Sequence, residues 1–364
     1  MVRRDLLIGG GALVLAGAGA AYASVRRLGS MDEYNASVAT ARAPLSVSPE
    51  VTDFIRYAAL AANSHNTQPW RFKITQGAIA IQPDMTRRIP VVDPDDHHLW
   101  ASLGCAAENL QLAAQARGRP GELRFEPAHD GGVVFDFGTG SPTGSPMFDA
   151  IPRRQSTRSD YDSKSVSTAD LTALAAAAAI PGVDVVLITD RPRINQVRDL
   201  IVTGNTAQMA DPAFVRELRA WLRFNPRAAI ETGDGLFSAT SGNPILPDWL
   251  GLSLFDWVFK ADAENAKYAQ QIATSAGLAV FVSQKDDREH WVLAGRACQR
   301  FALQATALGL KVAFVNQPVE VARFRPELAA LAGMPGRRPD IVMRLGYGAA
   351  LPYSARRSVE AVLA

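Results

Sequence analysis

The chain has 364 residues, of which 48% are hydrophobic and 20% charged, and its formal net charge is +2. This is the composition of an ordinary globular protein, long enough for two cores or one extended core. So small a net charge gives no reason to expect a nucleic-acid partner.

The first 23 residues are typical of an export signal. Arg3 and Arg4 precede a weakly hydrophobic run, residues 6–21, that is rich in glycine and alanine and ends at the small residues of an Ala-Tyr-Ala sequence, 21–23. Such an ending suits a signal peptidase. The paired arginines resemble a twin-arginine signal, which exports folded proteins and so allows a cofactor to be loaded first. We expect a signal peptide over 1–23 and a periplasmic or cell-envelope location; an uncleaved membrane anchor and a cytoplasmic location are the alternatives.

The N-terminal half begins after a polar stretch. Residues 24–47 are expected to be flexible, and Ser48 and Pro49 then begin a helix whose apolar stripe continues to Asn63. A polar loop, 63–70, follows this helix. Beyond it, a hairpin is predicted at 71–75 and 78–82 and short strands near 123–126 and 133–137, and these four strands flank a long helix.

That long helix is repeated in the chain. The segment 99–118 resembles 290–309 at an offset of 191, with identities at Trp100/Trp291, Gly104/Gly295, Ala106/Ala297, Leu112/Leu303, Ala114/Ala305, Ala116/Ala307 and Gly118/Gly309. Small residues such as Gly104 and Gly295 let another backbone come close. The repeat suggests a fused dimer with halves at 48–137 and 147–364, so that an intersubunit site would lie between the halves and the chain would be a monomer.

The C-terminal half follows a Gly/Ser/Pro/Thr linker, 138–146. A short helix ends near Arg154, and Ser167 caps a second, alanine-rich helix. Strands are predicted at 183–188, 278–283, 311–315 and 341–345, with a long helical stretch through Trp221 and an apolar insert, 224–259. Strands flanked by helices in each half predict layers of helices and sheets, and we assign the fold to the α+β class.

Two kinds of segment carry candidate chemistry. The loop Asn63-Ser64-His65-Asn66-Thr67-Gln68-Pro69-Trp70 gathers hydrogen-bonding groups held by a proline and a tryptophan, unless it is only an elaborate helix cap. Two arginine and serine clusters lie about 200 residues apart, at 153–158 and 353–357. They are either solvated faces or two parts of one phosphate site, where each charge-assisted bond contributes about 1.5–3 kcal/mol.

Together these segments resemble the nitroreductase-like flavoproteins. The loop is similar to their Ser-x-Asn-x-Gln-Pro-Trp sequence, 154–158 to their Arg-x-Ser-x-Arg/Lys opening, and 344–357 to their closing strand and basic tail. The resemblance runs from about Pro49 to the end of the chain. In that family FMN lies at a homodimer interface, and the likeness here is to a two-repeat, Acg-like branch. It implies a nitroreductase-like α+β fold whose two halves form a pseudo-dimer.

The resemblance also implies the flavin contacts, residue by residue. It places Arg158 at the N1/O2 edge of the ring, where negative charge gathers when flavin is reduced. The phosphate would be held by Arg154, Ser156 and either Arg356 or Arg357, and the opposite half would supply Ala62, Asn63, Ser64 and Asn66. Asn316 and Gln317 match, more weakly, the family segment near N5 and O4. The N-terminal half lacks its own Arg-x-Ser-x-Arg and the C-terminal half lacks a second loop, so one FMN per chain is predicted.

The resemblance leaves the activity open. Family members pass hydride from a nicotinamide through FMN to a nitroaromatic or quinone-like acceptor, yet an exported chain would meet little NAD(P)H. The chain is therefore either a flavin-dependent reductase, with an NAD(P)H donor uncertain, or an exported protein that binds or sequesters flavin without turnover. A structural or interaction protein is the third reading. The insert 224–259 is a lid over the flavin, a membrane-contacting surface or core packing.

Other residues are weaker candidates. His97 and His98 near Asp93, Asp95 and Asp96 suggest a metal site, but adjacent helical residues point apart, so we expect a solvated helix start and no metal. Cys105 and Cys298 are expected to be small buried hydrophobic residues. His65 faces the flavin or makes a structural hydrogen bond.

Overall fold

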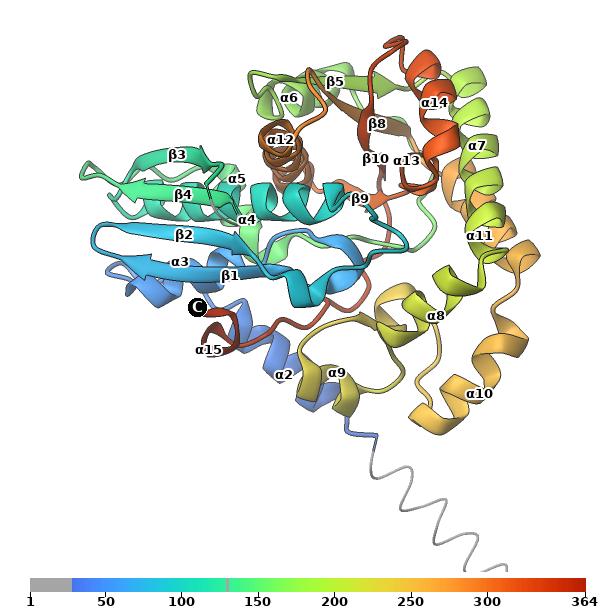
Figure 1. Cartoon of the computed structure of the whole chain (residues 1–364), viewed down its shortest axis with the longest axis horizontal. Helices are drawn as coiled ribbons and strands as arrows, with labels where there is room; N and C mark the ends of the chain where they lie inside the picture. Colours follow the sequence, from blue (N-terminus) through green and yellow to red (C-terminus); the bar gives the residue numbers. More distant parts are fainter. Residues whose placement is uncertain (1–27, 129–130) are drawn as a thin grey trace, which may run out of the picture.

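Two long helices cross at the centre of the molecule (Figure 1). The computed structural model describes residues 28–128 and 131–364, and in it α4 (His97–Ala116) packs along α12 (Arg288–Ala307). A Cβ placed on Gly104 would lie 2.0 Å from the Val292 carbonyl oxygen, and one on Gly295 would lie 1.9 Å from that of Ala101. Only glycine fits at either position, so the prediction that another backbone comes close there is confirmed.

Each central helix packs on its own four-stranded antiparallel sheet. The first sheet has the order β1-β2-β4-β3 and the second the order β5-β8-β10-β9. In both, two strands precede the central helix in the chain and two follow it, so the two orders correspond strand for strand. The strands are β1 (Trp70–Thr75), β2 (Ala78–Pro83), β3 (Gly121–Glu126), β4 (Gly132–Phe137), β5 (Val183–Ile188), β8 (Gly277–Ser283), β9 (Lys311–Phe314) and β10 (Pro339–Gly346). All eight predicted strands are confirmed within two residues.

The second sheet is buried on both faces. Along β8, Ala279 and Phe281 join the core beneath α12, while Leu278, Val280 and Val282 join the core on the other side. This alternation follows from the period of two in a strand. The outer core is covered by α7 (Arg191–Met209), α11 (Ala261–Ala273), α13 (Gln317–Glu320) and α14 (Arg325–Leu331), and α6 (Thr168–Ala177), capped by Ser167 as predicted, packs beside α12.

Segments of the C-terminal half complete the core of the N-terminal half. Phe148 and Ile151, on and just after α5 (Pro146–Ala150), belong to the core around α3 (Val51–Ala58) and α4. At the other end of the chain, Leu363, just after α15 (Val359–Val362), pairs with Phe72 of β1. These crossings bring Arg154 and the 353–357 cluster to the first half.

Two elements differ from expectation. Residues 31–41, within the stretch expected to be flexible, form α2 (Met31–Ala41), in which Tyr34 and Val38 are buried against α9 (Pro226–Thr232) and its surroundings. The signal was present, because Ser30 and Glu33 form a capping box. The helix expected to end at Asn63 is α3, which ends at Ala58.

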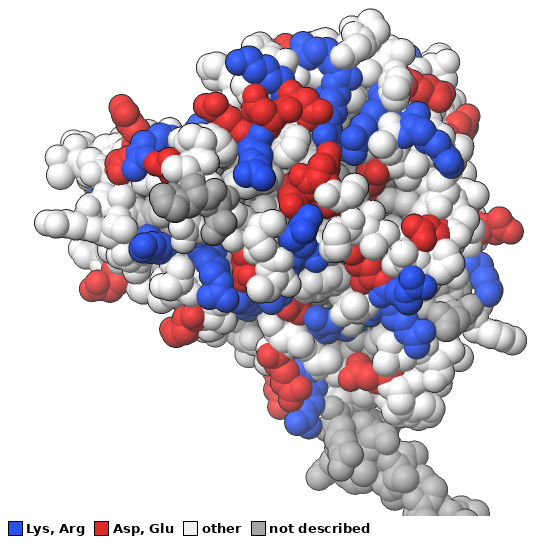
Figure 2. Space-filling model, in the orientation of Figure 1, with Lys and Arg blue, Asp and Glu red and all other residues white. Residues whose placement is uncertain are grey.

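The insert 224–259 contains α9, a short β7 (Leu236–Phe237) and α10 (Asp248–Val258), and the helical stretch before it is broken into α7 and α8 (Pro212–Ala220). Figure 2 shows acidic and basic side chains interspersed on the face of the molecule seen in Figure 1. Within residues 28–128 and 131–364, no helix has the length and apolar character needed to cross a membrane. The predicted signal peptide lies outside the described residues.

Candidate functional site

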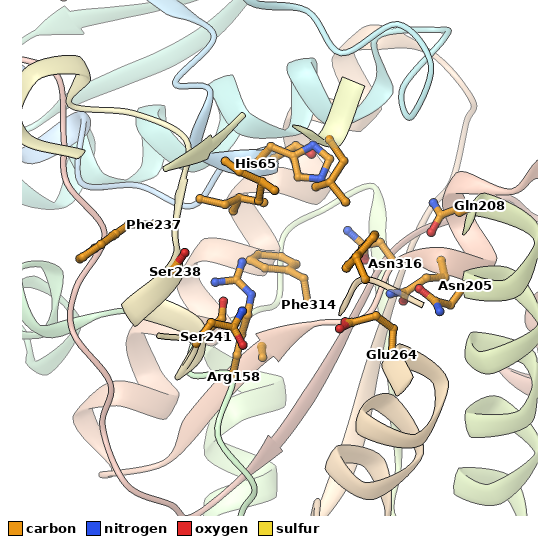
Figure 3. Close-up of a pocket in the computed structure, with 18 of the residues that line it drawn as sticks. His65, Arg158, Asn205, Gln208, Phe237, Ser238, Ser241, Glu264, Phe314 and Asn316 are labelled. Atoms are coloured by element: carbon orange, nitrogen blue, oxygen red, sulfur yellow. The ribbon is translucent and has the colours of Figure 1, made fainter. Parts of the chain in front are cut away.

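A cavity of about 530 Å³ lies where the two halves and the insert meet (Figure 3). The N-terminal half contributes residues 62–65 and part of α4, and the C-terminal half contributes Arg158, the end of β9 and residues of α7 and α11. The insert closes a further side with apolar side chains that include Phe224, Leu236 and Phe255. The volume suits a cofactor or other small organic ligand.

The polar loop 63–70 has an unusual backbone. His65, Asn66 and Gln68 have φ values of 47°, 54° and 52°, a region that residues other than glycine rarely occupy. The loop is held from inside, because the Asn63 Oδ1 accepts the Gln68 N–H at 2.9 Å. It is also held from the centre of the protein, because Gln299 of α12 accepts the Ala62 N–H at 3.2 Å. The loop is therefore built by tertiary contacts and is more than a helix cap.

The carbonyl groups that follow α3 explain why that helix ends early. Arg356 donates to the carbonyls of Ala59, Leu60 and Ala61 at 2.8–3.2 Å, and Arg154 donates to the Leu60 carbonyl at 3.2 Å. Guanidinium groups thus take the place of the helical N–H donors that would otherwise continue the helix.

Arg158 is positioned by hydrogen bonds to the backbone of residues 157–159. Arg344, on β10, donates to the carbonyls of Thr157 and Ser159 on either side of it, at 3.0 and 2.8 Å. Gln271 donates to the Arg158 carbonyl at 2.6 Å. The Arg158 side chain lies in the cavity (Figure 3), and no carboxylate among the described residues pairs with it. Burial lowers its pKa.

His65 faces the same cavity from the other half. Burial, together with the positive charge of Arg158, lowers the pKa of His65 to about 4. Its Nδ1 is buried and has no hydrogen-bond partner within the described protein. At neutral pH this imidazole is therefore uncharged and leaves a ring nitrogen free for a ligand.

A cluster of three arginines without acids lies beside the cavity; we call Arg42, Arg154 and Arg356 the arginine cluster. Arg42 donates to the carbonyls of Pro152 and Arg154 at 2.7 and 3.3 Å. Among residues 28–128 and 131–364, no carboxylate forms an ion pair with any of the three. The mutual repulsion of these charges, added to the larger effect of burial, lowers the pKa of Arg356 well below its ordinary value and that of Arg42 to about 9.

Arg154 has hydrogen-bond donors to spare. It is 3% exposed, and its Nε and Nη1 atoms are buried with no partner. The donors of Arg356, by contrast, are taken up by carbonyl oxygens and by the Asn66 Oδ1 at 2.9 Å. A buried cation with unused N–H groups is costly unless an anion binds there. Arg154 donates to the Leu60 carbonyl and Arg356 to that of Ala61, and the next residue, Ala62, lines the cavity, so the arginine cluster and the cavity adjoin.

The predicted site residues other than Arg357 thus fall into three groups. The cavity brings together Ala62, Asn63, Ser64, Arg158, Asn316 and Gln317. Arg154 and Arg356 lie in the arginine cluster, where Asn66 contacts Arg356 and does not line the cavity. Ser156 pairs with Val312 at the edge of β9, outside the cavity lining.

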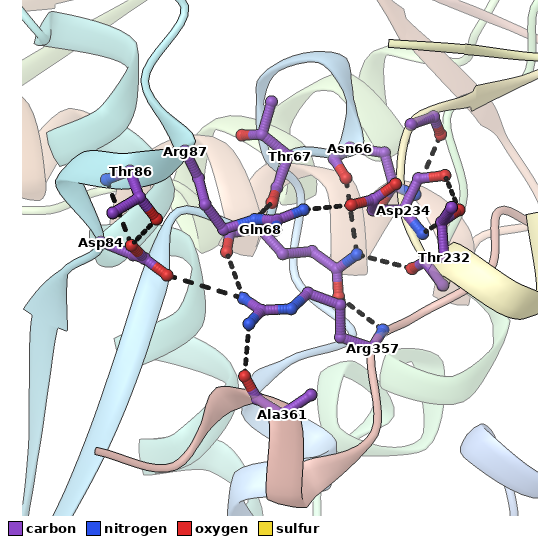
Figure 4. A network of polar contacts seen from close by, with 12 residues as sticks. Asn66, Thr67, Gln68, Asp84, Thr86, Arg87, Thr232, Asp234, Arg357 and Ala361 are labelled. Atoms are coloured by element: carbon purple, nitrogen blue, oxygen red, sulfur yellow. Dashed lines mark hydrogen bonds and ion pairs between the residues drawn. The ribbon is translucent and has the colours of Figure 1, made fainter.

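Arg357 belongs to a different network, which we call the tail clamp (Figure 4). Its backbone N–H donates to the Gln68 Oε1 at 2.9 Å, and its guanidinium lies 3.9 Å from Asp84. Nearby, Asp234 forms ion pairs with both Arg87 and Arg223. The tail clamp fastens the polar loop to the C-terminal tail and to the insert.

Two polar residues of the cavity wall, Glu320 and Tyr268, were not identified from the sequence. Glu320 lines the cavity and accepts a hydrogen bond from Gln208 at 2.6 Å, and burial raises its pKa to about 7. Tyr268 lies in the same wall, and burial raises its pKa to about 12. The closeness of Glu320 to the Asn316-Gln317 segment was the only available signal.

The expectation of a solvated start for α4 is wrong. Asp93, His97 and His98 are 3%, 1% and 6% exposed, and their nearest ligand-type atoms lie within 4.8 Å of one another. Asp93 is engaged as a helix cap, accepting the N–H groups of His98 and Leu99, and His97 lies 2.9 Å from Asp340. These contacts account for the burial and keep His98 in the cavity wall, where burial lowers its pKa well below the ordinary value.

Cys105 and Cys298 are free and buried, as expected. Cys105 donates a hydrogen bond to the Gly295 carbonyl at 3.1 Å, at the crossing of the central helices, and burial raises the pKa of Cys298. Neither has the environment of a reactive thiolate.

Several known proteins are similar to this chain. Two Mycobacterium tuberculosis proteins from different strains, provisionally named NAD(P)H nitroreductases, are 27% identical to this chain over 330 residues, covering 86% of it and 90% of each of them. Among solved structures, a nitroreductase with bound FMN from Bacteroides fragilis is 17% identical, with a TM-score of 0.38, over 59% of this chain and 96% of that one. The FMN-dependent nitroreductase NfnB from Mycobacterium smegmatis, in complex with NADPH, is 13% identical, with a TM-score of 0.37, over 56% and 87%.

The sequence profile of the Nitroreductase family matches residues 151–348, which is more than half of the chain. The matched range includes Arg158, the end of β9 and the closing strand β10. This chain therefore belongs to the Nitroreductase family.

Proposed function

We propose that this chain is an FMN-dependent oxidoreductase that binds one flavin between its halves, with the phosphate at the arginine cluster and the ring in the cavity. The arginine cluster carries this proposal. Arg154 offers two buried, unused N–H-bearing atoms beside other cations, and a phosphate is the anion that best satisfies such a group. FMN adds a ring of a size that suits the adjoining cavity of about 530 Å³.

The two-repeat interpretation is part of the same proposal. The two sheets have corresponding strand orders, and Gly104 meets Val292 as Gly295 meets Ala101, which are equivalent positions at the offset of 191. Reciprocal contacts of this kind are typical of a two-fold interface. We infer that one chain contains what is a homodimer in simpler members of the family, and we expect it to be a monomer.

The halves are not equivalent at the site. The polar loop comes from the first half, whereas Arg154 and Arg158 come from the second, and neither half repeats the other's contribution. One flavin per chain follows from this asymmetry.

The chain's own residues supply binding and electrostatics. Bound FMN would accept hydride at N5 and pass electrons to a nitroaromatic or quinone-like acceptor. Arg158, positioned by Arg344 and Gln271, would stabilise the negative charge that reduction brings to the ring edge. Neutral His65 offers a ring nitrogen to the ligand without opposing that charge, and apolar side chains of the insert would lie against the ring.

A second candidate function is flavin binding without NAD(P)H turnover. The observation in its favour is that the insert 224–259 lines the cavity with Phe224, Leu236, Phe237 and Phe255, where an incoming nicotinamide needs an open face. We also propose export by the twin-arginine route, and a protein outside the cytoplasm would need another reductant. The names of the M. tuberculosis relatives favour NAD(P)H as donor.

The test is the purified chain, yellow if loaded with flavin, with its flavin-to-protein ratio measured first. We expect a ratio near one, and a ratio near two would contradict the single-site proposal. Anaerobic bleaching by NADPH supports the reductase, whereas bleaching by dithionite alone supports the binding protein. A colourless protein that cannot take up FMN would overturn both.

A further inference from the structure

The helix α10 exposes an unusual amount of apolar surface. Trp257 is 81% exposed, Trp249 is 64% exposed and Leu254 is 37% exposed, although the helix has only eleven residues. The other tryptophans are buried or partly buried. On the opposite side of α10, Phe255 is 8% exposed and packs in a small core with Phe214 and Leu218 of α8 and with Ile89 and Val92 of the N-terminal half.

The exposed residues share one side of the helix. At 100° per residue, Trp249, Ser253 and Trp257 lie within about 80° of one another, and Leu254 borders them. Gly251 lies on the other side, where a Cβ would come within 2.4 Å of the Phe224 ring. The exposed residues are therefore not core residues that failed to pack, because the inward side of α10 already fills the space beneath the helix. Exposed apolar surface of this kind marks a contact site.

Tryptophan pairs suit one kind of partner. An indole has an apolar body and one polar N–H, and this combination favours the boundary between the headgroups and chains of a bilayer. A helix with aromatic and leucine residues on one side can lie in that boundary without crossing it.

The position of the leader points to the same side. The Arg227 N–H, on α9, donates to the Leu28 carbonyl at 2.8 Å, so the described chain starts against α9. Just before α9, Asn225 donates to the Asp248 side chain of α10 at 2.8 Å. The apolar run 6–21 thus precedes, by only a few residues, a point of the fold that is fastened to α10. A leader that remains uncleaved as a membrane anchor would hold α10 near the bilayer.

The same helix forms a wall of the cavity. Gly251, Leu254 and Phe255 line the cavity, and Leu254 is also among the exposed apolar residues. We propose that α10 binds the surface of a lipid bilayer through Trp249, Leu254 and Trp257. The second part of this proposal rests on the proposed oxidoreductase function: a lipophilic, quinone-like acceptor enters the cavity from the bilayer beneath this helix.

The test is flotation of the chain from Ser24 onward, which retains every residue that the structure describes, with phosphatidylcholine:phosphatidylglycerol (3:1) vesicles. The wild type should float with the vesicles. The fraction of protein bound to vesicles should be at least about tenfold lower for the Trp249→Ser/Trp257→Ser variant than for the wild type. The control is Ile74→Ser/Met85→Ser, which removes exposed apolar residues elsewhere and should float like the wild type.

Two outcomes would overturn the proposal. The first is a wild type that stays in solution, or a tryptophan variant that floats equally well. The second is a wild-type dimer in light scattering that the tryptophan substitutions convert to a monomer, since α10 would then bind a second copy of the chain.

A second measurement separates this inference from the proposed function. With FMN-loaded protein reduced by dithionite, reoxidation by a long-chain quinone in vesicles should slow at least about tenfold in the tryptophan variant, whereas reoxidation by a short, water-soluble quinone should not change. Equal slowing with both quinones would contradict entry from the bilayer. Failure of both proteins to reduce either quinone, with flotation intact, would contradict the proposed function and leave the lipid contact standing.

Discussion

Arg356 and Arg357 are neighbours in the sequence, but their side chains belong to arginine groups of opposite electrostatic character. Arg356 joins the arginine cluster with Arg42 and Arg154, where neutral oxygens are the acceptors. Arg357 joins the tail clamp, where the carboxylates of Asp84 and Asp234 face guanidinium groups. The two groups share the polar loop, since Asn66 contacts Arg356 and Gln68 contacts Arg357.

The difference separates the proposed phosphate site from a structural network. In the tail clamp each buried carboxylate is near a guanidinium, so these cations have acidic partners within the protein. In the arginine cluster the charges repel one another, and the Nε and Nη1 atoms of Arg154 have no acceptor. An arrangement that is costly alone and favourable with an anion is expected of a phosphate site.

The largest effect is expected from breaking the tail clamp. Replacing Asp234 with alanine leaves Arg87 and Arg223 without their shared carboxylate in a mostly buried place, which should cost about 3 kcal/mol of unfolding free energy. Urea denaturation measures this. Asp136→Ala is the control, because its ion pair with Arg124 is about half exposed and should contribute much less to stability.

Affinity for flavin should respond differently. The folded Asp234→Ala protein should bind FMN within about threefold of the wild type, because Asp234 does not line the cavity or the arginine cluster. If the substitution reduced the free energy of FMN binding by much more than it reduces the free energy of unfolding, the tail clamp would be part of the binding site.

The next effect is expected from Arg154→Ala. Loss of charge-assisted bonds to a phosphate should weaken FMN binding by about 2 kcal/mol, or about 30-fold in the dissociation constant. Riboflavin, which lacks the phosphate, should bind with unchanged affinity. Flavin fluorescence quenching measures both ligands. Without ligand the variant should be at least as stable as the wild type, because it no longer buries an unpaired cation.

Arg153→Ala is the matched control. Arg153 is exposed and, among the residues that the structure describes, donates only to the Asp149 carbonyl, so its loss should change neither FMN binding nor riboflavin binding. Equal weakening of both flavins by Arg154→Ala would move the phosphate away from the arginine cluster and contradict the assignment.

The sequence predicted the local parts of this comparison. The strand 183–188 is a β-branched run before a turn signal, and Gly104 and Gly295 are small residues in two copies of one helix, so short-range patterns were enough for both. The resemblance likewise named Arg154, Arg158 and the loop 62–64, and the structure brings them to one cavity or its edge.

The remainder depends on contacts between distant segments. No local pattern separates Arg356 from Arg357, since one meets carbonyls near residue 60 and the other meets Gln68 and Asp84. The burial of His97 results from Asp340, 243 residues away. α2 was missed because its two buried residues pack on the insert around Phe237, so the polar sequence alone suggested a mobile segment.

The smallest effect is expected from Glu320, an acid in the cavity that has no cationic partner in the described part of the chain, just as the arginines beside the cavity have no acidic partner there. Burial raises the pKa of Glu320 from 4.5 to about 7. Between these values the folded protein binds a proton that the unfolded chain releases, so this contribution to stability is complete below pH 4.5 and is lost as the pH rises through 7. From pH 5 to pH 8 the flavin-free wild type should lose about 1 kcal/mol through this group, since partial exposure of Glu320 limits the cost.

Glu320→Gln should not share this loss, because the neutral amide can still accept the Gln208 hydrogen bond. Urea denaturation at both pH values should therefore find the two proteins equally stable at pH 5 and the variant more stable at pH 8, whereas an equal pH dependence would mean that Glu320 is charged in the folded protein and has a partner.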